Sequence, residues 1–254
     1  MNKTVLITGA SSGLGKDFAT LFAEKGYDLV LTARRKKNLE EISDNLINQF
    51  GIKASIISCD LSNLKSTEEI YNFCEENKIQ INVLVNNAGY GLKDSFEKIS
   101  LSDHIDFINV LSTSAIALTR LFLPGMIKRK FGRIINVSSV AAFAPFTNSG
   151  GMYIATKLML LKFSEMIHND YKNKNIFSCS VCPGFTHTEF HNEMKEFKSS
   201  IPSFMWMESR TVVEQAYEAS MSGKEIIING WRYKILVFFM KITPKWLVKL
   251  LSGR

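Results

Sequence analysis

The sequence predicts a single α/β domain with a doubly wound parallel sheet of about seven strands and helices on both faces. Short apolar, β-branched runs alternate with longer segments in which apolar residues recur three and four positions apart, the rhythm of successive βα units. The runs are apolar almost throughout, as expected of strands covered on both faces. The chain has 254 residues, which suffices for one large domain with a sizeable core.

The expected elements follow this alternation along the chain. The strands are expected at 3–8, 27–33, 53–58, 81–87, 132–139, 176–182 and 225–229. The helices are expected at 14–26, 37–50, 66–78, 103–130 and 153–172. Because no internal repeat, low-complexity stretch or linker precedes residue 184, one domain over residues 1–230 and a tail over 231–254 are predicted.

Charge and composition narrow the class of protein only in part. A net charge of +7 permits an anionic partner such as nucleic acid, a membrane surface or a phosphorylated cofactor. Apart from Arg34, Arg35 and the tail, the basic residues are dispersed among acidic ones, which argues against nucleic-acid binding. The N-terminus shows no secretory signal, and no uninterrupted apolar run reaches membrane-spanning length, so a cytoplasmic location is expected.

Neither histidine nor cysteine spacing predicts a metal or redox site. His187 and His191 are four residues apart, as zinc ligands on a helix can be, but no glutamate follows the first histidine as a metalloprotease motif requires. Cys179 and Cys182 lie in a strand-like run, where residues three apart point to opposite faces. They are interpreted as ordinary buried thiols, and no metal is predicted.

A glycine-rich turn, "TGASSGLG" (8–15), follows the first strand, and a helical pattern starts at once. Gly9, Gly13 and Gly15 allow a tight turn and close approach of the backbone to a ligand, and the helix N-terminus would direct free N–H groups at a pyrophosphate. The spacing differs from the usual Gly-x-Gly-x-x-Gly fingerprint. Its place after the first strand of a βα series is therefore what favours a dinucleotide site.

The end of the second strand indicates which dinucleotide binds. A dinucleotide fold usually has an acidic residue about 20 positions past the glycine loop, where it binds the ribose 2′-hydroxyl. This chain has Ala33 there, followed by Arg34 and Arg35. Because a guanidinium pairs well with a 2′-phosphate, Arg34 is predicted to be a phosphate ligand and the cofactor to be NADP(H).

A tyrosine and a lysine stand four residues apart in a largely apolar helical segment, "GGMYIATKLMLLKF" (150–163). On a helix Tyr153 and Lys157 would share one face, with about 5–6 Å between their Cβ atoms. An ammonium beside the phenol would lower the tyrosine pKa from about 10 towards neutrality, where an acid/base catalyst is most effective. The pair is interpreted as catalytic rather than as a tyrosine beside a lysine that lies along an apolar surface.

Together these features resemble the short-chain dehydrogenase/reductase family. The matching motifs occur in the family's order over about residues 3–190, as "TGASSGLG" (8–15), "CDL" (59–61), "NNAG" (86–89), "NV" (109–110), "INVSS" (135–139), "YIATK" (153–157) and "PGFTHT" (183–188). The resemblance implies a Rossmann-like fold and oxidoreduction of a small-molecule carbonyl or alcohol. It also implies a homodimer or homotetramer formed through the helices at 103–130 and 153–172.

The resemblance assigns roles residue by residue. In the implied catalytic set, Tyr153 is the acid/base, Lys157 its partner, Ser139 the carbonyl-polarising hydroxyl and Asn109 the anchor of a proton path. Ser139 is preferred to Ser138, which lies farther from the tyrosine than the family's usual interval. Even Ser139 lies one position beyond it, so an extra residue is expected in "FTNSGG" (146–151).

The implied cofactor contacts come from the loops after five of the expected strands and from the helix expected at 153–172. They are Gly9, Ser11, Ser12, Gly13, Leu14, Gly15, Arg34, Arg35, Asp60, Leu61, Asn87, Ala88, Gly89, Tyr153, Lys157, Pro183, Gly184, Thr186 and Thr188. In the family, the residue matched by Asp60 reads the adenine amino group, and the one matched by Thr188 lies near the nicotinamide carboxamide.

Past residue 184 the sequence predicts less. Residues 186–208 occupy the family's substrate-lid position, and their apolar side chains favour an apolar or amphipathic substrate. These side chains are Met194, Phe197, Ile201, Phe204, Met205 and Trp206.

The basic and apolar tail has two interpretations. Lys234, Lys241, Lys245 and Lys249 fall near one helical face, and Pro244 should break or kink a helix. An element docked on the protein or on an oligomer partner is favoured. A peripheral contact with the inner face of a membrane stays open.

Three functions are consistent with these features. The leading hypothesis is an NADPH-dependent carbonyl reductase, reversible as an alcohol dehydrogenase. The alternative among enzymes is a 3-oxoacyl thioester reductase. The alternative from another class is a catalytically silent dinucleotide-sensing protein, which should lack one of the four catalytic residues, whereas this chain has all four.

Overall fold

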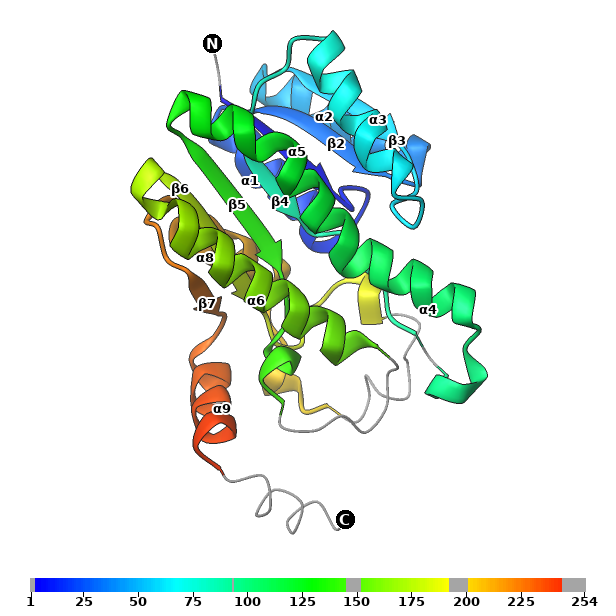
Figure 1. The fold of residues 1–254 in the computed structure, drawn as a ribbon, viewed down its shortest axis with the longest axis vertical. Coiled ribbons are helices and arrows are strands. Elements are labelled where there is room, and N and C mark those ends of the chain that lie inside the picture. The colour runs from blue at the N-terminus through cyan, green and yellow to red at the C-terminus, as the bar shows by residue number, and fades with distance from the viewer. Residues whose placement is uncertain (1–2, 93, 145–151, 192–200, 244–254) are drawn as a thin grey trace.

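Seven parallel strands make up the sheet in the described part of the chain, in the order β3-β2-β1-β4-β5-β6-β7 (Figure 1). The structure is a computed structural model that describes residues 3–92, 94–144, 152–191 and 201–243. The strands are β1 (Thr4–Thr8), β2 (Asp28–Ala33), β3 (Ala54–Ser58), β4 (Ile81–Asn86), β5 (Gly132–Val137), β6 (Ile176–Cys182) and β7 (Ile226–Ile228). The predicted parallel sheet is confirmed, and every strand end lies within two residues of its predicted position.

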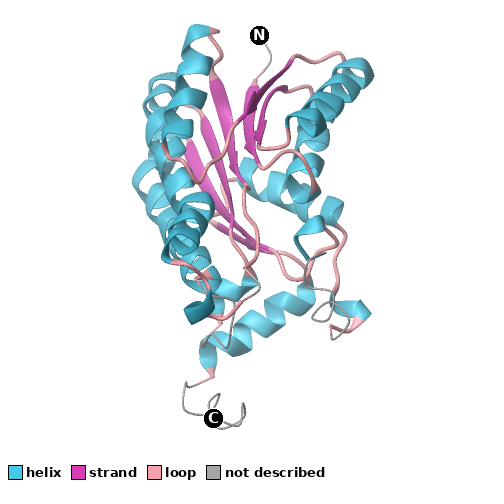
Figure 2. Ribbon diagram, turned by 90° about the vertical axis from the view of Figure 1, so that its right-hand side faces the viewer, coloured by secondary structure: helices cyan, strands magenta, loops and turns pink. Residues whose placement is uncertain are grey.

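Helices cover both faces of this sheet (Figure 2). One layer contains α1 (Gly13–Glu24), α2 (Lys36–Phe50) and α8 (Ser209–Met221), and the other contains α3 (Lys65–Glu76), α5 (Ser114–Arg129) and α6 (Tyr153–Tyr171). Two further helices lie beyond the carboxyl ends of the strands, α4 (Leu101–Ile108) and α9 (Trp231–Ile242).

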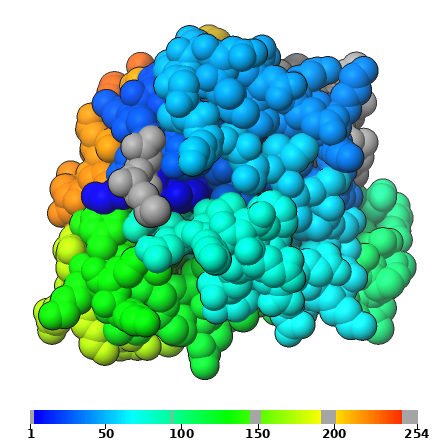
Figure 3. Space-filling view, turned by 90° about the horizontal axis from the view of Figure 1, so that it is seen from above, coloured from blue at the N-terminus to red at the C-terminus, as the bar shows by residue number. Residues whose placement is uncertain are grey.

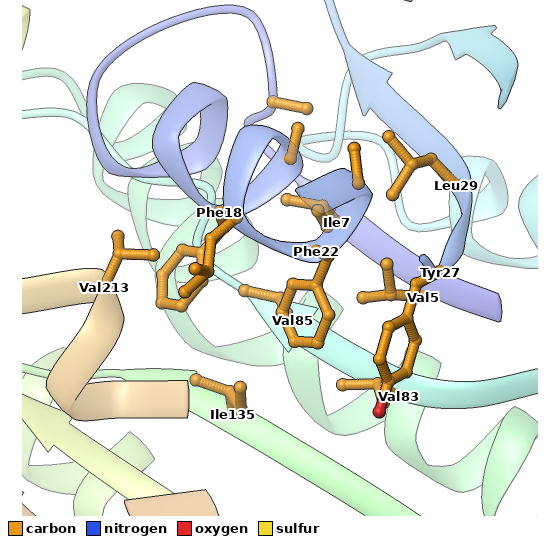
Figure 4. Close-up of a cluster of buried hydrophobic side chains, with 14 of the residues drawn as sticks. Val5, Ile7, Phe18, Phe22, Tyr27, Leu29, Val83, Val85, Ile135 and Val213 are labelled. Atoms are coloured by element: carbon orange, nitrogen blue, oxygen red, sulfur yellow. The ribbon is translucent and has the colours of Figure 1, made fainter. Parts of the chain in front are cut away.

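The packing of β1 shows why the strands are apolar throughout. Val5 and Ile7 face the layer of α1, α2 and α8, whereas Leu6 between them faces α3 and α5. On the first face, Phe22 of α1 lies edge-on to Tyr27 with ring centroids 5.1 Å apart. Figure 4 shows these rings among side chains from β1, β4 and β5. Because both faces of the sheet are covered, the strands do not alternate between apolar and polar residues.

Two features of the helices differ from the sequence-based expectation. No helix is predicted between β6 and β7, where α8 lies, because several of its buried side chains are small, such as Ala216, Ala219 and Ser220, and give a weak apolar period. The single helix predicted at 103–130 is α4 and α5 joined by a π-helical turn, η2 (Asn109–Thr113). Such turns inside helices are frequent at functional sites.

The continuous helical segment Leu101–Arg129 is long and apolar enough, by length and composition, to cross a membrane, although no such segment is expected from the sequence. Half of its most apolar stretch is buried inside the protein. Leu118, Phe122 and Met126 of α5 belong to the core cluster between α3, α5 and the sheet. The apolar character of this segment is therefore accounted for by the core of the domain.

The common direction of the strands places all their carboxyl ends at one end of the molecule. In Figure 1 this is the lower end, where α4 and α9 also lie, whereas the N-terminus is at the upper end. Figure 3 looks onto that upper end, where the blue and cyan segments of the N-terminal half lie against the green segment that leads into β5. In parallel sheets of this kind ligands bind outside the carboxyl ends, so the lower end is the place to look for a site.

The described part of the tail is docked on the domain, as the favoured interpretation has it. Tyr233 and Val237 of α9 are only 2% and 1% exposed. The Tyr233 hydroxyl accepts a hydrogen bond from the Phe185 N–H at 2.9 Å and donates one to the Met205 carbonyl at 2.7 Å. Residues 244–254, with Pro244 and the last lysines, lie outside the described residues.

Replacing Gly184 with alanine is expected to destabilise the protein, because the added Cβ would lie 1.9 Å from the Cζ atom of Tyr233. Overpacking of this kind typically costs about 1–3 kcal/mol in the free energy of unfolding, measurable by urea titration. The variant Gly184→Ala/Tyr233→Ala should lose less than the sum of the single variants, since the two residues are in contact. Strictly additive losses would contradict the contact.

Candidate active site

The loops after five strands meet at the carboxyl edge of the sheet and carry the predicted cofactor residues. The loop after β1 contributes Gly9 to Gly15, β2 is followed by Arg34 and Arg35, β3 by Asp60 and Leu61, β4 by Asn87 to Gly89, and β6 by Pro183 to Thr188. Residues that are separated in the sequence therefore lie around one end of β1, the middle strand of the set.

The glycine turn has a backbone that only glycine tolerates. Gly9 and Gly13 have φ values of +66° and +52°, in the left-handed region that side chains disfavour. A Cβ on Gly15 would lie 2.1 Å from the Gly9 carbonyl oxygen. The turn leads directly into α1, and Ser12 before it makes no capping hydrogen bond to the described helix. The N–H groups at this helix end fit an anionic group such as a pyrophosphate.

Thr8 holds the glycine turn and the loop after β4 together. Its Oγ accepts hydrogen bonds from the N–H groups of Asn87 at 2.9 Å and Ala88 at 3.0 Å. The Asn87 side-chain amide donates in turn to the Thr8 carbonyl at 2.9 Å. The Asn87 amide therefore supports the turn from within the protein. Sequence reasoning missed Thr8, although its position as the last residue of β1 marks it as the neighbour of both loops.

The two arginines after β2 have different surroundings. Arg34 is exposed, with its Nη1 3.9 Å from the Asp60 carboxylate. Arg35 lies across the glycine turn instead, with its Nε donating to Ser11 Oγ at 3.2 Å and its Nη2 to the Glu189 carboxylate at 3.0 Å. Arg35 therefore has the closer contact with the glycine turn, whereas the sequence-based prediction emphasises Arg34.

Glu189 belongs to the site, and sequence reasoning missed it. It begins a short 3-10 turn, Glu189–His191, directly after Thr188. A Cβ on Gly13 would lie 3.2 Å from the Thr188 Cβ, so this loop lies against the glycine turn. Partial burial raises the pKa of Glu189, but hydrogen bonds from Arg35 and Ser12 outweigh it and hold that pKa below its ordinary value.

A surface pocket of about 350 Å³ opens where these loops meet. It is lined by the glycine turn, by α2 and by the start of the lid, with Ser11, Ser12, Gly13, Lys16, Asn38 and Thr188 among its residues. Its hydroxyl groups, amide and ammonium can bind a phosphate group, whereas the carboxylates of Glu41 and Glu189, which also line the pocket, would oppose an anion.

The predicted catalytic pair lies at the start of α6, against the end of β5. The buried Lys157 ammonium donates to the Val137 carbonyl at 2.8 Å and lies 5.8 Å from the centroid of the Tyr153 ring. Ser138 Oγ donates to the Lys157 carbonyl at 2.8 Å. Ser139 Oγ accepts a hydrogen bond from the Ala141 N–H at 3.1 Å. Ser139 also lies near enough to the Tyr153 phenol to oppose the rise in its pKa, whereas Ser138 holds α6.

The expected effect of the lysine on the tyrosine is reversed in the structure. Burial raises the pKa of Tyr153 above 10, although the hydrogen bond with Ser139 opposes it. Burial also lowers the pKa of Lys157 to about 8. The prediction that Lys157 lowers the tyrosine pKa is wrong here because desolvation disfavours the charged form of both groups. The phenol stays protonated near neutral pH, which is the form that can give up a proton.

Asn109, the fourth predicted catalytic residue, has its side chain engaged elsewhere. Its amide donates to the Ser62 carbonyl at 3.0 Å, in the loop after β3. Asn109 is also the first residue of the π-helical turn. In that turn Ser112 Oγ donates to the Thr156 carbonyl at 3.0 Å. The turn therefore connects the loop after β3 to α6, between Tyr153 and Lys157.

One aromatic ring lies beside the tyrosine of the pair, and others lie together at the base of the lid. The Phe190 ring lies 5.8 Å from the Tyr153 ring, and the Trp206 ring lies 5.7 Å from Phe185 and 5.0 Å from His187. Within the described residues no group of three His, Cys, Asp or Glu side chains is arranged to hold a metal ion. The expected extra residue in 146–151 and the lid residues Met194 and Phe197 lie outside the described residues.

Comparison with known proteins agrees with this geometry. The family model described as short chain dehydrogenase matches residues 3–199. The chain belongs to the short-chain dehydrogenase family. It is 32% identical to the very-long-chain 3-oxoacyl-CoA reductase of Rattus norvegicus, over 98% of this chain and 83% of the relative. It is 31% identical to the 3-oxoacyl-[acyl-carrier-protein] reductase FabG of Aquifex aeolicus (strain VF5), over 79% and 82%.

A solved structure of the family resembles the whole chain. The short-chain dehydrogenase from Sphingobium yanoikuyae in complex with NADPH superposes with a TM-score of 0.83 and 27% identity, over 95% of this chain and 96% of that one. This short-chain dehydrogenase is therefore an oxidoreductase that acts on CH–OH or C=O groups, and its cofactor is NADP(H). The glycine turn, the free helix N-terminus and the two arginines fit that cofactor.

Replacing Lys157 with methionine should change the free energy of unfolding in a pH-dependent way. The pKa of Lys157 is about 8 in the folded protein, against an ordinary value of 10.5. Between these two pH values the unfolded chain binds more protons than the folded one, so the cost of burying the ammonium falls as pH rises. Below pH 8 that cost is fully present, and Lys157→Met should be more stable than the wild type by up to about 3 kcal/mol. Urea titrations from pH 7 to 10 should show this advantage shrinking. The exposed control Lys65→Met should show no such trend, and an advantage independent of pH would contradict the buried charge.

Replacing Glu189 with glutamine should tighten NADPH binding, because Arg35 is then free of a competing carboxylate. An exposed ion pair is worth about 0.2–1 kcal/mol, so the dissociation constant should fall by up to about fivefold, as measured by nucleotide fluorescence. Glu41→Gln, which changes a carboxylate in the same pocket, is the matched control and should have little effect. Weaker NADPH binding by Glu189→Gln would show that Glu189 positions Arg35 instead of competing for it.

Proposed function

We propose that this short-chain dehydrogenase is an NADPH-dependent reductase of apolar or amphipathic carbonyl compounds, with Tyr153 as the proton donor. The observation that carries the proposal is the group of the half-buried Tyr153 with the buried Ser139 and Lys157 at the carboxyl edge of the sheet. Ser139 follows β5, and Tyr153 and Lys157 belong to the first turns of α6. A protonated phenol beside a hydroxyl suits the reduction of a carbonyl, and the reverse reaction oxidises an alcohol.

The residues of the chain have distinct tasks in this reaction. NADPH, when bound, supplies the hydride that reduces the carbonyl carbon. Tyr153 gives its proton to the carbonyl oxygen, so that hydride and proton together complete the alcohol. Ser139 donates a hydrogen bond to that oxygen and stabilises the charge as it develops. Lys157 lies beside the tyrosine, with its ammonium held by the Val137 carbonyl, and Asn109 holds the turn through which a proton path would return.

The proposed cofactor residues bind the dinucleotide along the carboxyl edge of the sheet. The N–H groups at the start of α1 would hold the pyrophosphate. Arg35 and Arg34 would hold the 2′-phosphate, with Ser11 beside them. Asp60 would bind the adenine side, where its carboxylate already accepts the Ser62 N–H at 3.0 Å.

The substrate is proposed to be apolar or amphipathic because an aromatic ring lies beside the proposed proton donor and two more lie at the base of the lid. Phe190 lies beside Tyr153, and Phe185 and Trp206 pack against each other at the base of the lid. A 3-oxoacyl thioester is the second candidate, favoured by the relatives from Rattus norvegicus and Aquifex aeolicus, which are 3-oxoacyl reductases. A silent dinucleotide sensor is disfavoured by the intact catalytic set.

We further propose that the enzyme is a cytoplasmic homodimer or homotetramer, peripheral at the inner membrane face. Leu101 and Ile105 of α4 are 76% and 48% exposed, and Leu158, Met159 and Met166 of α6 are 41% to 50% exposed. Large apolar side chains in such number on two helices suit a subunit interface. The membrane contact is attributed to the tail, whose exposed side chains are considered below.

The proposal is tested by titrating the purified protein with NADPH and NADH and then screening ketones, aldehydes and acyl thioesters for cofactor oxidation. NADPH should bind at least about tenfold more tightly than NADH, because charge-assisted hydrogen bonds contribute about 1.5–3 kcal/mol. Arg35→Ala should remove most of this preference. The control is Lys36→Ala, which removes the neighbouring positive charge, paired with Glu40, and should keep the preference.

Tyr153→Phe is the variant that separates catalysis from binding. It should bind NADPH like the wild type but lose at least about 100-fold in turnover, the usual contribution of a general acid. Preference for NADH would overturn the assignment of the arginines. Undiminished turnover by Tyr153→Phe would overturn the assignment of the proton donor.

A further inference from the structure

One face of α9 carries a stripe of exposed apolar side chains. Trp231, Ile235, Phe238 and Ile242 recur four, three and four positions apart, and Phe239 lies beside them. Their exposed fractions lie between 49% and 64%. At about 100° per residue these five side chains share roughly a quarter to a third of the helix circumference. An exposed apolar patch of this kind marks an interaction surface.

The stripe points away from the domain. Tyr233 and Val237, the buried residues of α9, lie on the opposite side of the helix. Tyr233 docks α9 on the lid and on the loop after β6 through its hydroxyl. The stripe is therefore not the face by which α9 is held on its own chain.

The charges on both sides of the stripe are all positive. Arg232 lies on one side and Lys234 and Lys241 on the other, and all three are exposed. Residues 231–254 contain no Asp or Glu. An apolar stripe between basic flanks suits an anionic bilayer, where the rings enter the interface and the cations meet phosphate groups. A second copy of the helix would bring like charges together, so the charge distribution favours lipid over self-association.

The docked side of α9 contacts the loops on the substrate side of the active site. The Arg232 guanidinium donates to the Phe204 carbonyl at 3.0 Å, and Phe204 is itself 58% exposed. The Lys241 ammonium lies 4.9 Å from the centroid of the Phe143 ring, in the turn after Ser139. Tyr233 joins both ends of the described lid, at Phe185 and Met205. The surface that would enter a bilayer is thus adjacent to the loops that border the catalytic residues.

We propose that α9 lies in the interface of an anionic membrane and presents the substrate side of the active site to the bilayer, so that the enzyme takes a lipid-soluble carbonyl compound from the membrane. This inference rests on the proposed carbonyl-reductase function and adds the source of the substrate to it. Trp231, Phe238 and Phe239 provide the apolar anchor, and Arg232, Lys234 and Lys241 provide the attraction to anionic headgroups.

Vesicle sedimentation tests the membrane contact without reference to activity. The full chain should bind vesicles of phosphatidylcholine and phosphatidylglycerol more tightly than phosphatidylcholine alone, and salt should weaken the binding. Phe238→Glu/Phe239→Glu should weaken it at least tenfold. Ile47→Glu/Leu64→Glu, which places the same charges on exposed apolar positions of α2 and the loop before α3, should bind like the wild type. Lys234→Gln/Lys241→Gln should weaken binding to the anionic vesicles alone, by about fivefold per lysine.

Activity then tests the delivery of substrate. With NADPH, Phe238→Glu/Phe239→Glu should reduce a water-soluble ketone at the wild-type rate but reduce a long-chain ketone dissolved in the anionic vesicles several-fold more slowly.

Equal rates of the variant and the wild type on the vesicle substrate would overturn the delivery of substrate from the membrane. Absence of vesicle binding by the wild type would overturn the membrane contact, as would a change of oligomeric state in the glutamate variant, which would assign the stripe to a second copy. Failure of the wild type on every soluble carbonyl would instead overturn the carbonyl-reductase function, and sedimentation would still report on the membrane contact.

Discussion

The attachment of α6 to the end of β5 is the constraint on which the rest of the site depends. Two hydrogen bonds run in opposite directions across it, from the Lys157 ammonium to the Val137 carbonyl and from the Ser138 hydroxyl to the Lys157 carbonyl. They fix the first turn of α6, and with it Tyr153, next to Ser139. The same attachment buries both ionisable groups, so the geometry that assembles the pair also keeps the phenol protonated and makes the ammonium easier to deprotonate.

The cofactor side of the site depends on a different kind of interaction. Backbone conformation dominates there, because the glycine turn follows a path that side chains would block and Thr8 ties it to the loop after β4. The charged side chains beside this turn, Arg34, Arg35 and Glu189, are exposed. Arg35 contacts the turn at Ser11 and the carboxylate of Glu189 at once, so one guanidinium connects the glycine turn to the lid.

The substrate side is organised by Tyr233. Its ring occupies the space left by Gly184, and its hydroxyl bonds to the loop after β6 and to the far end of the described lid. The C-terminal helix is therefore a structural part of the substrate side rather than an appendage. An exposed apolar stripe on such a helix couples the environment of α9 to the loops that border the catalytic residues.

The sequence alone determined the strands, the order of the motifs and the edge at which the site lies, because hydrophobic period and glycine spacing are local properties and parallel strands bring their ends together. The helical spacing of Tyr153 and Lys157 predicted that they share one face, and the family resemblance added Ser139 to that pair. Only the tertiary structure decided the direction of the pKa of Tyr153, since burial is set by the packing of distant segments. It likewise decided the contacts of Arg35 with Glu189 and of Gly184 with Tyr233, which join residues far apart in the chain and leave no periodic signal in the sequence.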